Sequence, residues 1–183
     1  MRIISGKYKG KRIQAPKKLP VRPTTDMAKE ALFNILNNYY DFDEVAVLDL
    51  FAGTGNISFE FASRGTADIV SVDKDYGCIK FIAAVARELE LNIKTFKDDA
   101  FKFLEKNKIQ YHLIFADPPY DMKQEDFENL VNLVFKNELL KEEGMLVVEH
   151  SKFTDLSKAL YFKEQRRYGG SVFSFFQASE SKK

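Results

Sequence analysis

Short apolar segments alternate with helical segments over most of this chain, and this alternation restricts its fold more than any other feature. Buried strands are predicted at residues 45–50, 68–72, 93–96, 112–116 and 145–149. Helices are predicted between and after them, at residues 57–64, 76–90, 100–106, 125–135 and 154–159. Strands that alternate with helices in this way form a parallel sheet with helices on both faces. The predicted fold class is therefore α/β, with a doubly wound and mostly parallel sheet.

Further elements flank this alternation. Residues 161–165 and 171–177 are predicted strands, and we expect them to form an antiparallel pair at one edge of the sheet. Residues 26–40 repeat apolar side chains at helical spacing, preceded by the N-cap candidates Thr24, Thr25 and Asp26. The 183 residues contain no internal repeat and no long linker, so we expect a single domain.

Residues 1–25 form a basic arm without a single Asp or Glu. Eight of the 28 lysines and arginines of the chain lie there: Arg2, Lys7, Lys9, Lys11, Arg12, Lys17, Lys18 and Arg22. The remaining 20 face 27 acidic residues, so the net charge of +1 conceals a basic arm on an acidic body. Apolar residues interleave with the charges, and Gly6 and Gly10 bracket a turn, which favours an ordered hairpin over a merely solvated terminus. We expect this arm to contact phosphates.

Composition excludes several classes of protein. No apolar run has the length of a membrane span and no leader segment is recognisable, so a cytoplasmic protein is expected. The single cysteine, Cys78, excludes an internal disulfide framework and a Cys-rich metal site. His112 and His150 lie at strand positions, where a structural role is favoured over a catalytic one. No metal site is expected.

A glycine-rich turn with Phe51, Gly53 and Gly55 follows the first predicted strand, which carries Asp49 near its end. Ligands of open α/β sheets bind at the carboxyl ends of the strands, and glycines let the backbone approach them closely. Asp73 ends the next strand at about the spacing expected of a carboxylate that binds ribose hydroxyls. Ser58 stands where a dinucleotide fingerprint has its third glycine, which favours an adenosyl ligand without phosphates over NAD.

The third predicted strand also ends in acids. Asp99 is placed to accept a hydrogen bond from an adenine amino group, or to cap the helix that begins at Ala100, or to do both. With their neighbours, these strand ends give the predicted cofactor-binding set: Asp49, Phe51, Gly53, Gly55, Asp73, Lys74, Asp99 and Ala100.

The fourth predicted strand delivers the segment Asp117-Pro118-Pro119-Tyr120 to the same edge. An exocyclic amine of a base is a poor nucleophile because its lone pair is delocalised into the ring. Two acceptors that hold its N–H groups would aim that lone pair at a methyl donor, and Asp117 and the Pro118 carbonyl supply two acceptors. The prolines also stiffen the loop, which a near-attack geometry requires. Tyr120 can stack on a base that is turned out for reaction. The alternative is that the prolines merely end a strand.

These two motifs resemble the amino-methylating branch of the class I S-adenosylmethionine-dependent methyltransferases. The N-terminal segments are more specific and resemble the opening of the bacterial 16S ribosomal RNA guanine-N2 methyltransferase family, the RsmD family. They are Arg2-Ile3-Ile4-Ser5-Gly6, Lys9-Gly10-Lys11-Arg12, Val21-Arg22-Pro23-Thr24-Thr25-Asp26 and Glu30-Ala31-Leu32-Phe33-Asn34. Val148-Glu149 and Tyr168-Gly169-Gly170 extend the resemblance over nearly the whole chain. Ser5, where the family more often has glycine, and Thr54 and Asn56, which vary within the turn, depart from the pattern outside the expected chemistry.

The resemblance implies a seven-stranded methyltransferase fold that transfers a methyl group from S-adenosylmethionine to the N2 of a guanine in 16S ribosomal RNA. The partner would be the small ribosomal subunit or an assembly intermediate, bound by a monomer. Asp117, Pro118 and Tyr120 would hold the guanine, and Arg22, Thr24 and Thr25 would lie near the mouth of the site. The expected RNA contacts are Arg2, Lys7, Lys9, Lys11, Arg12, Arg22, Thr24 and Thr25.

Three other functions remain open. A DNA adenine-N6 methyltransferase uses the same loop, although the chain has no room for a target-recognition region. A non-catalytic RNA-binding or ribosome-assembly factor could keep the fold without the reaction. A dehydrogenase is the weakest alternative, because the glycine turn lacks the pyrophosphate signature.

Overall fold

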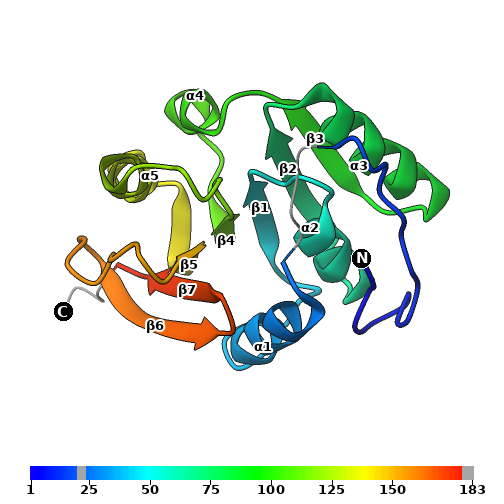
Figure 1. Cartoon of the computed structure of the whole chain (residues 1–183), viewed down its shortest axis with the longest axis horizontal. Helices are drawn as coiled ribbons and strands as arrows, with labels where there is room; N and C mark the ends of the chain where they lie inside the picture. Colours follow the sequence, from blue (N-terminus) through cyan, green and yellow to red (C-terminus); the bar gives the residue numbers. More distant parts are fainter. Residues whose placement is uncertain (20–23, 179–183) are drawn as a thin grey trace.

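The computed structural model describes residues 1–19 and 24–178, and these residues build one seven-stranded sheet with the order β3-β2-β1-β4-β5-β7-β6 (Figure 1). The strands are β1 Ala46–Leu50, β2 Asp68–Asp73, β3 Ile93–Lys97, β4 Tyr111–Ala116, β5 Leu140–Ser151, β6 Phe162–Tyr168 and β7 Ser171–Phe176. The helices are α1 Asp26–Leu36, α2 Asn56–Ser63, α3 Tyr76–Glu88, α4 Ala100–Lys106 and α5 Gln124–Lys136. The predicted α/β fold class is confirmed.

Strands β1 to β5 pair in parallel, and β7 pairs antiparallel with both β5 and β6. The chain moves from β1 outwards to β3 and then crosses back to β4, so the strand order reverses between β1 and β4. Right-handed crossovers on the two sides of this point place helices on opposite faces of the sheet. The predicted antiparallel pair at one edge is confirmed as β6 and β7.

Side-chain alternation along the strands explains the two layers of helices. The strand residues that share a face with Val47 pack against α1 and α2. Those that share the opposite face with Leu48 pack against α4 and α5. Figure 1 shows α4 and α5 on one side of the sheet and α1 and α2 on the other. Helix α3 packs beyond α2 in a third apolar cluster, through Ile82, Val85 and Leu89.

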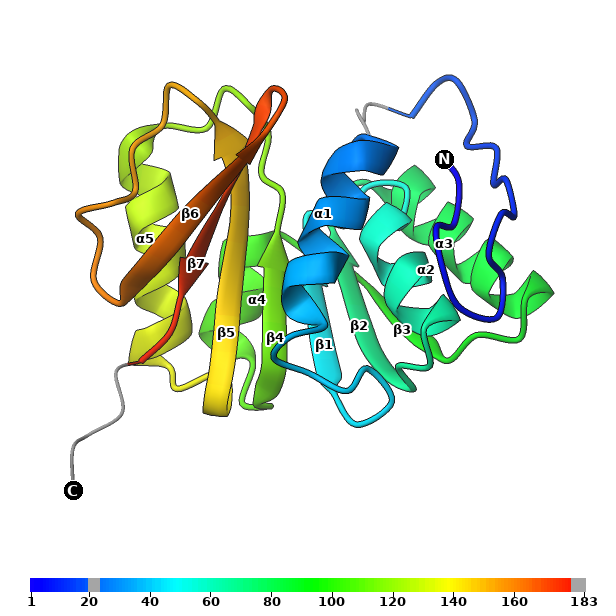
Figure 2. The same ribbon diagram turned by 90° about the horizontal axis from the view of Figure 1, so that it is seen from below.

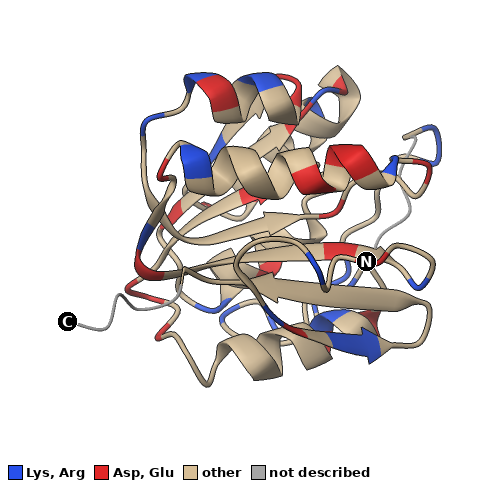
Figure 3. Cartoon of the chain, turned by 90° about the vertical axis from the view of Figure 1, so that its left-hand side faces the viewer, with Lys and Arg blue, Asp and Glu red and all other residues tan. Residues whose placement is uncertain are grey.

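The placement of charged residues stabilises helix α5. In α5 the first turn holds Glu125 and Asp126 and the last turn holds Lys136. This order complements the helix dipole, whose N-terminal end is positive. Figure 3 shows the resulting separation of red and blue along α5 (Figure 3). No helix of residues 1–19 and 24–178 is long and apolar enough to cross a bilayer.

Two predicted helices differ from the structure. The helix predicted at residues 154–159 is absent, and turns occupy this stretch. There the Asp155 carboxylate accepts a hydrogen bond from the Ser157 amide at 2.9 Å, a local bond that competes with helix formation. The helix predicted at 26–40 ends at Leu36, where Asn37 and Asn38 begin a turn.

Residues 1–13 of the basic arm are ordered and pack into the body of the protein. Its hairpin pairs through a bridge between Arg2 and Arg12, and the Ile3 amide donates to the Lys11 carbonyl at 2.9 Å. Ile3 and Ile13 are buried against α2 and α3. The tyrosine hydroxyl of Tyr8 donates to the Leu89 carbonyl at the end of α3. The arm is therefore part of the core as well as a source of charge.

A buried ion pair fixes the start of this arm. Lys29 Nζ of α1 lies 3.3 Å from Glu60 Oε2 of α2, and both side chains are buried. Glu60 also accepts hydrogen bonds from the Ile4 and Ser5 amides, at 2.8 and 3.0 Å. Lys29 donates to the Arg2 carbonyl at 2.7 Å. Burial lowers the pKa of Lys29, and the charge of Glu60 offsets part of that effect. Arm, α1 and α2 thus meet at one polar cluster.

Breaking this cluster should destabilise the whole fold. The substitution Glu60→Gln leaves Lys29 buried without its counter-ion and should lower the free energy of unfolding by about 3 kcal/mol or more. Urea denaturation measures this loss. The control Asp68→Asn breaks the exposed pair with Lys94 and should cost no more than about 1 kcal/mol. Equal losses in the two variants would contradict the importance given to the buried pair.

Candidate active site at the carboxyl edge of the sheet

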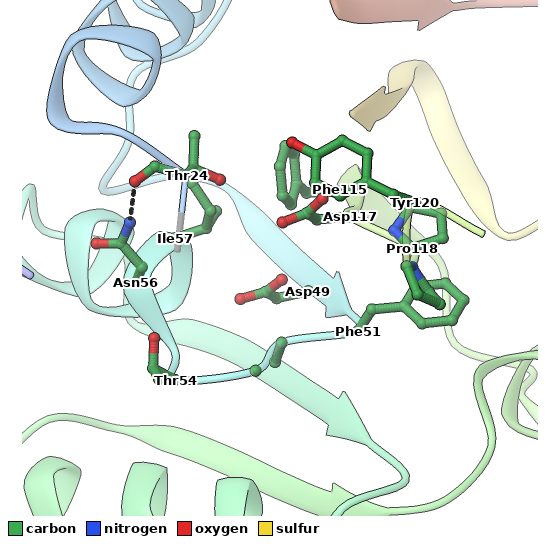
Figure 4. Close-up of a pocket in the computed structure, with 13 residues that line it drawn as sticks. Thr24, Asp49, Phe51, Thr54, Asn56, Ile57, Phe115, Asp117, Pro118 and Tyr120 are labelled. Carbon is green, nitrogen blue, oxygen red and sulfur yellow. Dashed lines mark hydrogen bonds between the residues drawn. The ribbon is translucent and has the colours of Figure 1, made fainter. Parts of the chain in front are cut away.

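A cleft of about 240 Å³ opens where the carboxyl ends of β1 and β4 meet, at the point where the strand order reverses. Figure 4 shows the side chains of Asp49 and Asp117 pointing into this cleft, with Thr24 and Asn56 on one side and Tyr120 on the other (Figure 4). The lining residues are Thr24, Asp49, Phe51, Ala52, Gly53, Thr54, Asn56, Ile57, Phe115, Asp117, Pro118, Pro119 and Tyr120. The glycine turn and the Asp117–Tyr120 segment therefore form two walls of one cavity.

The glycine turn has an unusual backbone. Phe51, Gly53 and Gly55 all have positive φ, at 57°, 55° and 76°. A non-glycine residue such as Phe51 adopts this region at a cost, and such outliers cluster at functional sites. A Cβ on Gly55 would lie 2.9 Å from Ile82 Cγ1 and 3.0 Å from the ring of Phe59, so this position also has no room for a side chain. Gly55 is the N-cap of α2 and does not itself line the cleft.

Asp49 forms the floor of the cleft. Its Oδ2 accepts a hydrogen bond from Ser58 Oγ at 2.5 Å, and Ser58 Oγ lies 2.7 Å from Ser71 Oγ. Burial raises the pKa of Asp49 to about 7, with Ser58 acting in the opposite direction and the charge of Asp73 adding to the rise. Ser58, which stands where a dinucleotide fingerprint has its third glycine, therefore donates a hydrogen bond to the carboxylate of Asp49.

The other predicted cofactor residues lie at strand ends outside the lining of the cleft. Asp73 Oδ2 accepts a hydrogen bond from the Gly53 amide and Oδ1 from the Asp75 amide, both at 2.8 Å. Asp73 thereby braces the glycine turn, and Lys74 follows it. Asp99 Oδ1 caps α4 by accepting from the Phe101 and Lys102 amides, at 3.0 and 3.2 Å, and Ala100 is the first residue of that helix. The capping role of Asp99 is confirmed, and its contact with adenine stays a prediction.

Asp117 comes directly after β4, where its amide still donates to the Leu50 carbonyl of β1. It is half-buried, whereas Pro119 and Tyr120 are exposed at the rim. Burial raises the pKa of Asp117 well above its ordinary value, and the negative charges of Glu149 and Asp49 raise it further. The structure thus places an acid with a strong affinity for a proton at the mouth of the cleft.

Thr24, at the end of the basic arm, is held by a network that the sequence analysis missed. Thr24 Oγ1 donates to Glu149 Oε2 at 2.7 Å, and its carbonyl accepts from Asn56 Nδ2 at 3.1 Å. Lys29 Nζ in turn donates to Asn56 Oδ1 at 2.7 Å. An acid at the end of a buried strand was the available signal for Glu149, whereas nothing in the local sequence marks Lys29 as buried.

The predicted RNA contacts do not gather at one place. Thr24 lines the cleft, Thr25 caps α1, and Arg2 pairs with Asp26 in the first turn of α1. The turn that carries Lys7 and Lys9 instead packs against Ser63, at the end of α2 that points away from the cleft. Figure 2 shows the arm reaching from one end of α2 to the other (Figure 2). Lys11 and Arg12 lie on its returning half, and Arg22 lies outside the described residues.

Both histidines and the cysteine have structural surroundings. His112 Nδ1 accepts a hydrogen bond from the Ala46 amide at 2.9 Å, and His150 Nε2 lies 2.7 Å from Ser174 Oγ. Burial lowers the pKa of both imidazoles. Cys78 is buried, and burial raises the pKa of its thiol to about 12, which disfavours the nucleophilic thiolate.

Comparison with known proteins places this architecture in a family. The model of the family described as conserved hypothetical protein 95 matches residues 1–177. The chain belongs to this family, the RsmD-family methyltransferases.

Its relatives match over most of their length. YlbH of Bacillus subtilis (strain 168), provisionally named an rRNA methyltransferase, is 35% identical over 165 residues, which cover 87% of this chain and 88% of YlbH. Ribosomal RNA small subunit methyltransferase D of Escherichia coli (strain K12) is 31% identical over 157 residues, which cover 81% of this chain and 74% of that protein. The solved structure of hypothetical protein TTHA0928 of Thermus thermophilus aligns with a TM-score of 0.83 at 26% identity and covers 97% of this chain and 99% of that one.

The backbone of the glycine turn gives a direct test of this site. In Gly55→Ala a residue with a side chain must adopt the left-handed backbone conformation, and its Cβ presses against Ile82 and Phe59. The substitution should therefore lower the free energy of unfolding by about 1–3 kcal/mol. Urea denaturation measures the loss. The control Gly170→Ala adds a Cβ that meets no atom within 4 Å and should change stability by about 0.5 kcal/mol or less. A neutral Gly55→Ala would show that the turn is not constrained as described.

Proposed function

We propose that this methyltransferase transfers a methyl group from S-adenosylmethionine to the exocyclic N2 amine of a guanine in small-subunit ribosomal RNA. The observation that carries the proposal is the placement of Asp117 and Pro118 at the mouth of the cleft whose opposite wall is the glycine turn. The relatives named as ribosomal RNA methyltransferases support the substrate class. The small subunit or an assembly intermediate as partner, a monomeric state and a cytoplasmic location belong to the same proposal.

The charge of the cleft fits this cofactor. Asp49 and Asp117 line it, and no Lys or Arg is among the described lining residues. Such a site favours a cationic sulfonium and opposes the phosphates of a dinucleotide. Gly53 has no side chain, so a ligand in the cleft can approach its backbone closely. Asp73 and Asp99, at the neighbouring strand ends, would accept hydrogen bonds from ribose and adenine. The cofactor, when bound, supplies an electrophilic methyl group.

The residues of the chain would orient the base for attack. The Asp117 carboxylate and the Pro118 carbonyl accept the two N–H groups of the amine and turn its lone pair towards the cleft. Tyr120, which is 55% exposed at the rim, offers a face on which the base stacks, an interaction worth about 1–3 kcal/mol elsewhere. Positioning of this kind accelerates reaction because the reacting atoms are already close and aligned.

Removing the proposed acceptor should abolish turnover and leave binding largely intact. For Asp117→Asn we expect kcat to fall about 10²-fold or more, because the amide cannot match a carboxylate as acceptor. Methyl transfer is measured under single-turnover conditions, with cofactor and RNA affinities measured separately. The control Asp121→Asn changes an exposed acid in the same loop and should keep wild-type turnover. Full methyl-transfer activity of Asp117→Asn would overturn the role given to Asp117, whereas a wild-type protein that binds RNA but transfers no methyl group would favour the non-catalytic assembly factor.

One experiment identifies base and substrate together. The protein is incubated with methyl-labelled S-adenosylmethionine and with small subunits that lack their natural methylation, free ribosomal RNA or duplex DNA. We expect label only in ribosomal RNA, recovered as N2-methylguanine. Label recovered from DNA as N6-methyladenine would instead establish the rival methyltransferase.

The arm must be tested by charge reversal, because its removal would also remove Ile3 and Ile13 from the core. The double variant Lys7→Glu/Lys9→Glu should weaken RNA binding and lower the slope of log affinity against log salt by about one for each phosphate that the arm no longer neutralises. The matched control reverses Lys102 and Lys136, which are exposed on α4 and α5 at the other face of the sheet. Equal effects of both double variants would show that the hairpin turn does not bind RNA specifically.

A further inference from the structure

Glu149 is a buried acid near the end of β5, and it has no role in the reaction proposed above. It is 3% exposed. Thr24 Oγ1 donates to its Oε2 at 2.7 Å, and Ser171 Oγ donates to its Oε1 at 2.6 Å. Both carboxylate oxygens therefore accept a hydroxyl hydrogen bond, and such bonds favour the ionised form. At this point of the sheet, the two hydroxyl donors therefore stabilise the carboxylate of Glu149 against the opposing effect of burial.

The strand register brings this charge next to Asp117. Ala116 of β4 pairs with Val148 of β5, so the following residues, Asp117 and Glu149, stand beside each other. Neighbouring strands are about 4.8 Å apart. Both residues continue the face that carries Phe115 and Val147. Two carboxylates on neighbouring strands and on the same face repel each other, and the charge of Glu149 acts on Asp117.

The groups around Asp117 are mainly acidic. β5 contributes Glu149 and β1 contributes Asp49, while Asp73 at the end of β2 acts on Asp49. Tyr120 lies in the same loop as Asp117. The residues that α2 and the start of α1 bring to the cleft are uncharged: Thr24, Asn56 and Ile57.

The surroundings of Asp117 all act on its pKa in the same direction. Burial first, then the charge of Glu149 and then that of Asp49 raise its pKa well above the ordinary range. Burial also raises the pKa of Glu149, but the hydroxyls of Ser171 and Thr24 act in the opposite direction. Glu149 is therefore the acid of this pair whose ionised form is stabilised by hydroxyl donors.

We propose that Glu149 is a positioning residue whose fixed negative charge makes Asp117 the acceptor for the proton that the methylated amine releases. This inference rests on the function proposed above. As the nitrogen lone pair forms the N–CH3 bond, the S–CH3 bond breaks and its electron pair stays on sulfur. The nitrogen then carries a positive charge and gives one N–H proton to the Asp117 oxygen that already accepts its hydrogen bond. Glu149 acts only through Asp117.

The charge coupling is measured first, in ligand-free protein, by following the Asp117 side-chain carboxyl through a pH titration with ¹³C NMR. Asp117→Asn identifies the resonance. In Glu149→Gln the midpoint should move to lower pH by about one unit or more, because the neighbouring charge is removed. Glu149→Asp keeps the charge and should keep a midpoint near that of the wild type. The control Glu142→Gln removes an exposed acid from the other end of β5 and should cause no shift.

The pH dependence of kcat then tests the role in the reaction. In Glu149→Gln the acidic limb of the profile should move to lower pH, and the plateau should fall about three- to tenfold because Asp117 has become a weaker proton acceptor. KM for RNA should change less than twofold. If Glu149→Gln does not fold, Ser171→Ala removes one donor to Glu149 without removing a charge, and should produce a smaller shift in the same direction.

The outcomes separate the two proposals. An unchanged Asp117 midpoint in folded Glu149→Gln, or an unchanged acidic limb, would overturn the role of Glu149 while wild-type methylation still supports the proposed function. Wild-type protein that methylates no RNA would overturn the proposed function itself, whatever the NMR titration gives.

Discussion

The Lys29–Glu60 ion pair is the constraint on which the arrangement at the carboxyl edge depends. Two fully buried charges are tolerable only when every remaining donor and acceptor is satisfied. Here the partners come from two segments: the arm gives the Ile4 and Ser5 amides and the Arg2 carbonyl, and α2 gives the Asn56 amide oxygen and, at its C-cap, the Arg64 guanidinium. Asn56 then holds the Thr24 carbonyl. The cost of burying this pair thus makes the positions of the arm, α1 and the wall of the cleft mutually dependent.

Parallel topology explains why the acids of the site converge although they are far apart in sequence. Asp49, Asp117 and Glu149 lie at the ends of β1, β4 and β5, which are adjacent in the sheet. Asp49 lies two residues after Val47, Asp117 two residues after Phe115 and Glu149 two residues after Val147, all three of which are buried on that face. The mutual repulsion of the acids is a cost of the fold, and hydroxyl hydrogen bonds to Asp49 and Glu149 offset part of it. Asp117 is the least buried acid of this group.

Much of this could be predicted from the sequence, because strand and helix periods are local. The seven strands, the antiparallel pair at one edge and the wall residues Gly53, Asp117 and Tyr120 follow from segments read one at a time. The failures have a common physical origin. At residues 154–159 the Asp155 carboxylate bonds to a backbone amide, and turns form in place of the predicted helix. Lys29 is buried because Glu60 and Asn56, which are distant in sequence, bind its ammonium group. The ordered hairpin predicted for the arm is confirmed, and the burial of Ile3 and Ile13 adds that it belongs to the core.

The separation of charge in the molecule bears on how a polyanion could be its substrate. An acidic cleft repels phosphates, so a strand that binds here must keep its backbone outside and present a base. The exposed basic side chains of the arm, such as Lys7 and Lys9, lie at the far end of α2 and cannot neutralise Asp49 or Asp117. A nucleic acid drawn to the positive surface would therefore enter the cleft base first. In the proposed reaction the same acids would stabilise the positive charge that moves from sulfur to nitrogen, so exclusion of phosphate and stabilisation of the reacting charge would have one origin.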